Sequence, residues 1–122
     1  MQSLEMQVGK YQKGMLAVIV MFAALLGVYW NLQYHDFINY DDPAYIAENY
    51  YVKKGLTWEG IKWAFGDIHT GYGHPLTWIS HMMDYELFGL RSGGHHWTNL
   101  IFHILSALIL FHLFRTMTGD FW

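Results

Sequence analysis

Two apolar segments near the ends of this chain most constrain the fold that it can adopt. Residues 14–32 and 97–114 contain no aspartate, glutamate, lysine or arginine. Each segment is about as long as the roughly 17–25 residues that cross a bilayer. Because backbone groups within lipid must be hydrogen-bonded inside their own segment, both are predicted to be helices. We therefore expect an all-α membrane protein, with two transmembrane helices joined by a loop at residues 33–96.

Each apolar segment also has a second interpretation. Two lysines precede the first segment, as they do in a cleaved secretory signal. However, this segment ends at Tyr29 and Trp30, which suit a membrane interface, and lacks the small residues of a cleavage site. The second segment is short enough for a buried helix of a soluble protein, but Trp97 and Arg115 at its ends favour a membrane span.

Charge and cysteine usage narrow the function classes. Lys10 and Lys13 precede the first span and Arg115 follows the second, so both termini are predicted to be cytoplasmic and the loop extracytoplasmic. The net charge is −3, and no basic patch indicates binding to nucleic acid. The absence of cysteine excludes disulfides, iron–sulfur clusters and thiolate zinc sites.

Capping signals divide the loop into about three short helices. Asp42 followed by Pro43 is a helix-start signal, and Gly55 is a helix-end signal. Thr57 can cap a second helix, and a third is expected to end before Gly89. The expected helices are residues 44–54, 58–65 and 75–88, with a glycine-rich loop at 66–73.

The third of these helices has two unlike sides. Thr77, His81 and Asp84 recur at helical spacing and form a polar side. A broad apolar side consists of Leu76, Ile79, Met82, Met83, Leu87 and Phe88. Such a helix can lie flat at the membrane interface or pack against protein, and the lack of a basic face leaves both interpretations open.

Asp41 and Asp42 form an acidic pair shortly after the first span. Carboxylates are costly to hold near a low dielectric, which suggests a function such as general base or metal ligand. Adjacent side chains point apart, so we expect one to face a site while the other caps the following helix. The alternative is that both only form a turn and a cap before Pro43.

Further along the loop, His74 precedes a proline at a helix start. Its backbone is therefore expected to be extended, with the ring displayed. A helix N-terminus favours anions, so a phosphate is expected near His74 and Thr77. The alternative is a surface histidine at a turn.

A polar stripe follows the second span at steps of three, four and three residues, formed by His96, Asn99, His103 and Ser106. Three interpretations are open: hydrogen bonds to a neighbouring helix, one side of a binding site, or haem ligation with a second chain. His69, His95 and His96 do not have the spacing of a familiar zinc site, so no metal ligands are assigned. The cofactor expectation is either none or a divalent metal ion.

Several segments in order resemble the amino-terminal part of GT-C superfamily membrane glycosyltransferases. The likeness is greatest to bacterial proteins that join such a part to tetratricopeptide repeats and are related to protein O-mannosyltransferases. It covers nearly the whole chain from Phe37. The segments that carry it are Phe37-Ile38-Asn39-Tyr40-Asp41-Asp42-Pro43-Ala44-Tyr45, Gly55-Leu56-Thr57, Trp63-Ala64-Phe65, His74-Pro75-Leu76-Thr77-Trp78, Leu87-Phe88-Gly89-Leu90, and His95-His96 with Asn99.

The resemblance implies transfer of a sugar from a polyprenyl-phosphate donor to a protein or glycan acceptor at the outer face of a bacterial inner membrane. The leading acid of the family matches Asp41, where it orients or deprotonates the acceptor hydroxyl, and the neighbouring acid matches Asp42. The histidine-proline segment matches His74-Pro75, with one proline where the O-mannosyltransferases often have two. The expected substrate contacts are His74, Thr77, His81, His96 and Asn99.

Family members have many more spans, so the chain is expected to be the amino-terminal module of a longer enzyme and inactive alone. The alternative from the residues is a small non-catalytic membrane protein. It would bind a partner through its aromatic loop and the polar stripe, because six tryptophans and seven methionines offer adaptable contact surface.

Overall fold

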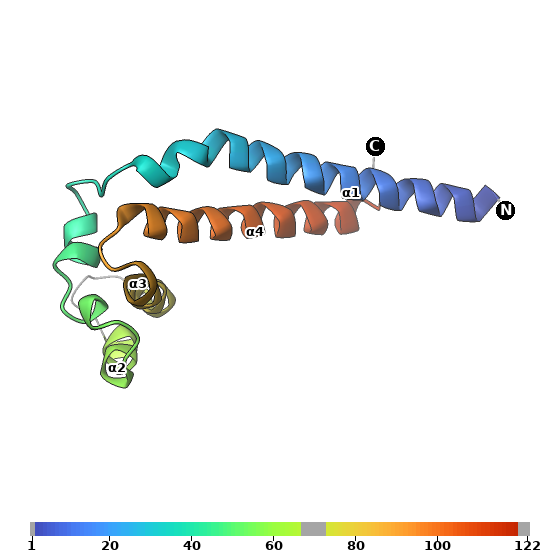
Figure 1. The fold of residues 1–122 in the computed structure, drawn as a ribbon. Coiled ribbons are helices and arrows are strands. Elements are labelled where there is room, and N and C mark those ends of the chain that lie inside the picture. Colours follow the sequence, from blue (N-terminus) through green and yellow to red (C-terminus); the bar gives the residue numbers. More distant parts are fainter. Residues whose placement is uncertain (1, 67–72, 120–122) are drawn as a thin grey trace. The chain divides into compact units, whose positions relative to one another are not determined.

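The computed structural model describes residues 2–66 and 73–119, and these residues form helices without any strand. The expectation of an all-α protein is therefore confirmed. Figure 1 shows the order of the elements along the chain. They are α1 (Gln2–Tyr29), η1 (Trp30–Tyr34), η2 (Pro43–Ala47), η3 (Val52–Lys54), α2 (Trp58–Gly66), α3 (Pro75–Phe88) and α4 (Ser92–Thr118). They group into two compact units, residues 1–31 with 99–122, and residues 32–98.

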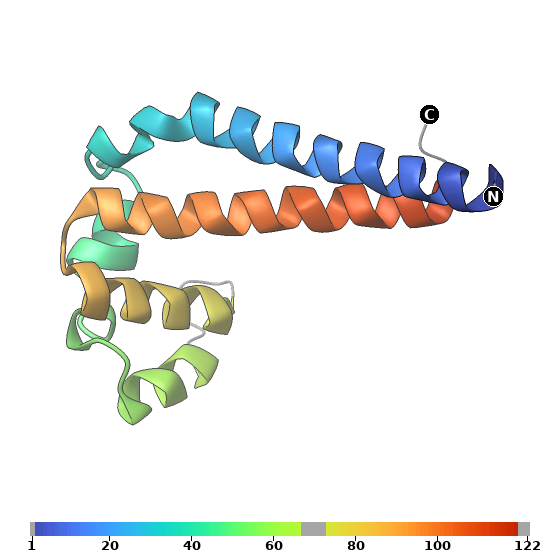
Figure 2. The same cartoon turned by 45° about the vertical axis from the view of Figure 1, so that its right-hand side comes forward.

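In the first unit, α1 and the part of α4 from residue 99 onward lie side by side and run antiparallel (Figures 1 and 2). The Gly14 backbone is buried against the Arg115 guanidinium, where a larger residue would overlap it. Toward the other end of this pair, the Tyr29 and His103 rings meet edge to face at 5.4 Å. Leu100 and Ile104 are the buried apolar residues of α4.

Two helical segments are long and apolar enough to cross a membrane, Tyr11–Tyr34 with 24 residues and Ser92–Thr118 with 27. At 1.5 Å per residue they extend about 36 and 40 Å, more than the roughly 30 Å hydrocarbon core of a bilayer. Only 0% and 11% of their most apolar windows is buried inside the protein. A core helix of a soluble protein would be mostly buried, so this exposure favours lipid as the surrounding solvent. The predicted spans, 14–32 and 97–114, lie within these segments.

The second unit, residues 32–98, has an aromatic core of its own. Val52, Ala64, Trp78 and Met82 are buried at its centre. Tyr45 stacks on Trp78 at 4.7 Å between ring centres, and the Tyr51 ring stacks in the same way on a tryptophan of α2 at 4.6 Å. Helix α3 packs against both α2 and η3. The loop between the two apolar helices is therefore a folded unit.

The structure corrects the first of the three expected loop helices. Instead of one helix at 44–54, the chain forms two short turns, η2 and η3. Asn49 separates them, because its side-chain oxygen accepts the backbone N–H groups of Tyr51 and Val52 at 3.0 and 3.1 Å. An asparagine side chain that bonds nearby backbone in this way competes with helix hydrogen bonds.

The other capping signals act as expected. Gly55 ends η3 with a φ of 72°, and Gly89 ends α3 with a φ of 62°, a left-handed conformation that favours glycine. The Thr57 hydroxyl accepts the Gly60 N–H at 3.0 Å and caps α2. Of the loop expected at 66–73, residues 67–72 lie outside the described residues.

Helix α3 does not bury its apolar side as a whole. Met82 is fully buried, but Leu76, Met83 and Leu87 are exposed. On the polar side, Asp84 is buried and His81 half-buried, while Thr77 is exposed. The sequence pattern therefore identified two chemically distinct sides correctly but did not indicate which of them would face the core.

Candidate functional site

The acidic pair forms a closed turn just before η2. The Asp42 carboxylate accepts the backbone N–H of Ile38 at 2.7 Å. Asp42 occupies the N-cap position of η2 but makes no side-chain capping bond there, so the capping role expected for it is wrong. Asp41 accepts the Tyr45 N–H through its backbone carbonyl at 2.9 Å, and its side chain is exposed. The two carboxylates thus have different positions, one closing the turn and one reaching solvent.

Aromatic packing holds this acidic turn against α3. Tyr45, which follows the turn, stacks on the fully buried Trp78 and meets the His81 ring edge to face at 6.5 Å. Burial lowers the pKa of His81, and the charge of Asp42 is among the smaller influences that oppose this shift. Two of the residues expected at a substrate site, Asp42 and His81, are therefore neighbours in the folded loop.

The electrostatics of His81 are set mainly by its burial. Desolvation lowers the pKa of His81 below its usual value of 6.5, and the neighbouring His95 lowers it further. The carboxylates of Asp84 and Asp42 oppose this shift without reversing it. His81 is therefore a neutral imidazole at neutral pH, with a free lone pair on one ring nitrogen.

A compact polar cluster that includes His81 lies where α3 meets the start of α4. His81, Asp84 and His95 each place a potential ligand atom within 4.8 Å of the others. The Asp84 carboxylate accepts the Thr98 hydroxyl at 2.6 Å, and its second oxygen lies 3.7 Å from His95 Nδ1. Asp84 and His95 are 3% and 2% exposed, so water cannot supply hydrogen bonds that the protein does not provide.

The sequence pattern placed Asp84 on a polar helix side and His95 among histidines without familiar zinc spacing, and it did not bring the two together. The sequence does carry a signal for two of the three residues, because His81 and Asp84 are three residues apart and therefore lie on the same side of one helix. His95 approaches them only through the turn at Gly89, whose carbonyl oxygen accepts His95 Nε2–H at 2.9 Å. Sequence spacing alone does not indicate that approach.

The other residues expected to contact substrate are more dispersed. His74 is the non-helical residue before α3, as expected before a proline, and both His74 and Thr77 have exposed side chains. They lie outside the cluster of His81, Asp84 and His95. A phosphate near His74 and Thr77 stays a prediction.

The polar stripe of α4 is used in several separate ways. His96 donates from Nε2 to the His35 carbonyl at 3.1 Å. The Ser106 hydroxyl donates to Phe102 of its own helix at 2.8 Å, and His103 contacts Tyr29. Asn99 is exposed.

Replacing both Asn99 and His103 with leucine is expected to leave the helical content nearly unchanged. Intramembrane polar contacts average only about 0.6 kcal/mol, so any self-association through these two residues should be weak and sensitive to detergent. Circular dichroism and analytical ultracentrifugation measure both quantities. Ser106→Ala is the matched control, since its hydroxyl is satisfied within α4. A tight, monodisperse dimer that the double leucine variant abolishes would contradict this expectation.

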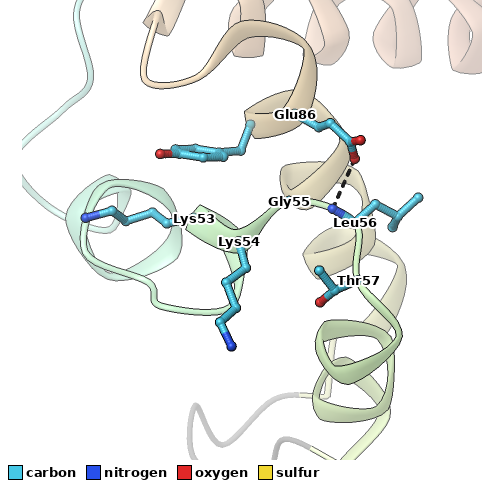
Figure 3. Close-up of a pocket in the computed structure, with 7 residues that line it drawn as sticks. Lys53, Lys54, Gly55, Leu56, Thr57 and Glu86 are labelled. Atoms are coloured by element: carbon cyan, nitrogen blue, oxygen red, sulfur yellow. Dashed lines mark hydrogen bonds between the residues drawn. The ribbon is translucent and has the colours of Figure 1, made fainter.

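A shallow hollow of about 340 Å³ lies between η3 and the end of α3 (Figure 3). Its charged groups are largely paired within the protein. Glu86 accepts the Leu56 N–H at 3.2 Å, and Lys54 lies 3.0 Å from Glu59. Hydrogen bonds with Tyr50 and then Glu59 raise the pKa of Lys54. Since these charges already have partners, we do not assign a ligand to this hollow.

Comparison of the chain with protein-family models, with curated proteins and with solved structures finds no match.

Proposed function

We propose that this chain is the amino-terminal module of a membrane glycosyltransferase, which transfers a sugar from a polyprenyl-phosphate donor to an acceptor hydroxyl. The observation that carries the proposal is the exposed Asp41 carboxylate on a turn whose geometry is fixed by its neighbours. Asp42 closes the turn through Ile38, and Tyr45 holds it on Trp78. Because the backbone of this turn is fixed, less conformational entropy is lost when the Asp41 carboxylate is positioned on a substrate.

In the proposed reaction, Asp41 accepts the proton of the acceptor hydroxyl. The oxygen of that hydroxyl bonds to the anomeric carbon of the sugar, and the bond from this carbon to the donor phosphate breaks. The electron pair leaves with the polyprenyl phosphate, which is already an anion and a good leaving group. Asp42 supports the geometry of Asp41, and the exposed His74 contacts the donor phosphate or the acceptor.

The two helices of membrane-spanning length support a membrane location for the reaction. We propose an integral protein of a bacterial inner membrane with both termini in the cytoplasm and residues 33–96 in the periplasm. Lys10 and Lys13 before the first apolar segment and Arg115 after the second support this orientation, whereas Lys53, Lys54, Lys62 and Arg91 in the loop oppose it. Polyprenyl-phosphate donors present their sugars at a membrane surface, where a folded loop between two spans can reach them.

Cysteine labelling tests this orientation. Glu48 is exposed in the loop and Lys13 is exposed before the first span, and the chain has no cysteine of its own. A Glu48→Cys variant should react with a membrane-impermeant maleimide in cells whose outer membrane alone is permeabilised. The matched Lys13→Cys variant should react only after the inner membrane is lysed. Labelling of Glu48→Cys only after lysis would reverse the proposed orientation.

The transfer reaction itself is tested with the full reading frame that encodes this chain, purified and placed in proteoliposomes. Radiolabelled polyprenyl-phosphate mannose serves as the first donor, with a serine- and threonine-rich peptide as acceptor. Label should move to the acceptor from this donor or from its glucose or galactose counterpart, but not from a nucleotide sugar. Failure of all the polyprenyl-phosphate sugars with both peptide and glycan acceptors would refute the proposal.

A second candidate function is partner binding by a non-catalytic two-span protein. The observation that favours it is the set of large apolar side chains left exposed on the folded loop. They include Tyr40, Trp58, Phe65, Leu76 and Leu87. The reading frame discriminates the two candidates: further spans after Trp122 favour the transferase, whereas an immediate stop with an independent promoter favours the binding protein.

A further inference from the structure

The cluster of His81, Asp84 and His95 brings together two hydrogen-bond acceptors with no donor between them among the residues that the structure describes. A carbonyl oxygen can only accept, so the bond from His95 to Gly89 requires the proton to be on Nε2. The opposite nitrogen of a neutral His95 is then an acceptor with a free lone pair. This Nδ1 faces an oxygen of Asp84, which is also an acceptor, and is buried without a hydrogen-bond partner in residues 2–66 and 73–119.

A positive charge between these two acceptors would remove the repulsion between them. The distance between His95 Nδ1 and the Asp84 oxygen indicates whether that charge is a proton or a metal ion. If His95 were protonated and bonded directly to Asp84, the atoms should approach to about 2.7–2.9 Å. The observed separation is 3.7 Å. Two ligands held about 2.0–2.1 Å from a tetrahedral zinc ion lie roughly 3.4 Å apart, which is closer to the observed value.

His81, the third residue of the cluster, also has the properties of a metal ligand. His81 Nδ1 is also buried without a hydrogen-bond partner among the described residues. An imidazole nitrogen that no protein group engages can offer its lone pair to a metal ion. Because His81 lies at the half-buried edge of the cluster, an ion can reach the site from that side.

Neighbouring residues orient Asp84 and His95 through hydrogen bonds, as residues around a metal site commonly orient the ligands of the ion. The Thr98 hydroxyl binds one Asp84 oxygen at 2.6 Å and leaves the other directed toward His95. The Gly89 carbonyl fixes the His95 tautomer, a common arrangement for metal-bound histidines. The Phe37 ring meets His95 edge to face at 5.3 Å and shields that ring from water.

We propose that His81, Asp84 and His95 bind a zinc ion. Two imidazoles and one carboxylate suit zinc better than magnesium or calcium, which prefer oxygen ligands. Three protein ligands leave a fourth position for water or substrate. The site links α3 to the start of α4, so the bound ion also stabilises the folded loop. This inference does not depend on the proposed sugar transfer.

The test uses the whole chain in nanodiscs, stripped with a chelator and then titrated with Zn²⁺ or with Co²⁺ as an optical probe. We expect about one ion per chain and the intense visible absorption of tetrahedral Co²⁺. Asp84→Asn and His81→Gln should each abolish stoichiometric binding. Thr98→Val, which removes only an outer contact, should weaken binding by about 10–100-fold. His112→Gln, an exposed histidine at the far end of α4, should bind as the unchanged chain does.

Two outcomes would overturn the proposal. The first is an unchanged chain that binds no Zn²⁺ and whose His95 ring is an imidazolium by nitrogen NMR, which would show a proton in place of the metal ion. The second is equal binding by the unchanged chain and by the correctly folded Asp84→Asn and His81→Gln variants. The first outcome is measured on the unchanged chain alone. Misfolding of a variant therefore cannot obscure it.

Discussion

Asp41→Asn should lower the rate of sugar transfer by about 10²–10⁴-fold, the usual contribution of a positioned general base. Asparagine keeps the size of the side chain but cannot accept the proton of the acceptor hydroxyl. The turn should survive, because its two hydrogen bonds use the Asp42 carboxylate and the Asp41 backbone carbonyl. The transfer assay in proteoliposomes gives the rate, and circular dichroism confirms the fold.

Asp36 provides the matched control for this change. It is an exposed aspartate in the same segment, before the turn, and it is not part of the acidic pair. Asp36→Asn should transfer sugar at the rate of the unchanged protein, and Asp41→Glu should retain part of it. If Asp41→Asn transferred sugar at the full rate, Asp41 would not be the base.

Trp78→Ala should destabilise the folded loop by about 3–5 kcal/mol, the usual cost of truncating a fully buried tryptophan. The Trp78 side chain is completely buried, and it contacts the rings of both Tyr45 and Trp63. Removing it leaves a cavity and frees Tyr45, which holds the acidic turn. Hydrogen exchange at residues 43–54 measures the free energy of local opening.

Two further variants test whether the loss of packing causes the loss of stability in Trp78→Ala. Trp78→Phe should cost much less, because it keeps an aromatic ring and removes an indole N–H that is buried without a hydrogen-bond partner among the described residues. Trp58→Ala removes a side chain that is 70% exposed and should change the stability by less than about 0.5 kcal/mol. Equal losses for the buried and the exposed tryptophan would contradict the aromatic core.

Local signals predicted much of the loop correctly. The threonine cap of α2 and the glycine ends at Gly55 and Gly89 depend on the conformations of only a few neighbouring residues. The error at 44–54 has a local cause as well, since the Asn49 side chain takes two backbone N–H groups that a continuous helix would need. Propensity over the whole segment did not reveal that competition.

The candidate site was less predictable than the fold. The sequence singled out the acidic pair and His81, but it assigned Asp42 to a helix cap where the structure has a bond to Ile38. It also treated the polar residues of α4 as one stripe. In the structure His96 bonds the backbone of His35, whereas Ser106 is satisfied within α4.

The sequence by itself determined that this chain has two helices long and apolar enough to cross a membrane, with a polar, helical loop between them. Segment length, hydrophobicity and capping residues act locally, so they can be read along the chain. Only the tertiary structure decided that α3 turns His81 and Asp84 toward the core, and that His95 meets them there. That meeting depends on how the aromatic core seats α3 and on the turn at Gly89, and such long-range packing leaves no periodic pattern in the sequence.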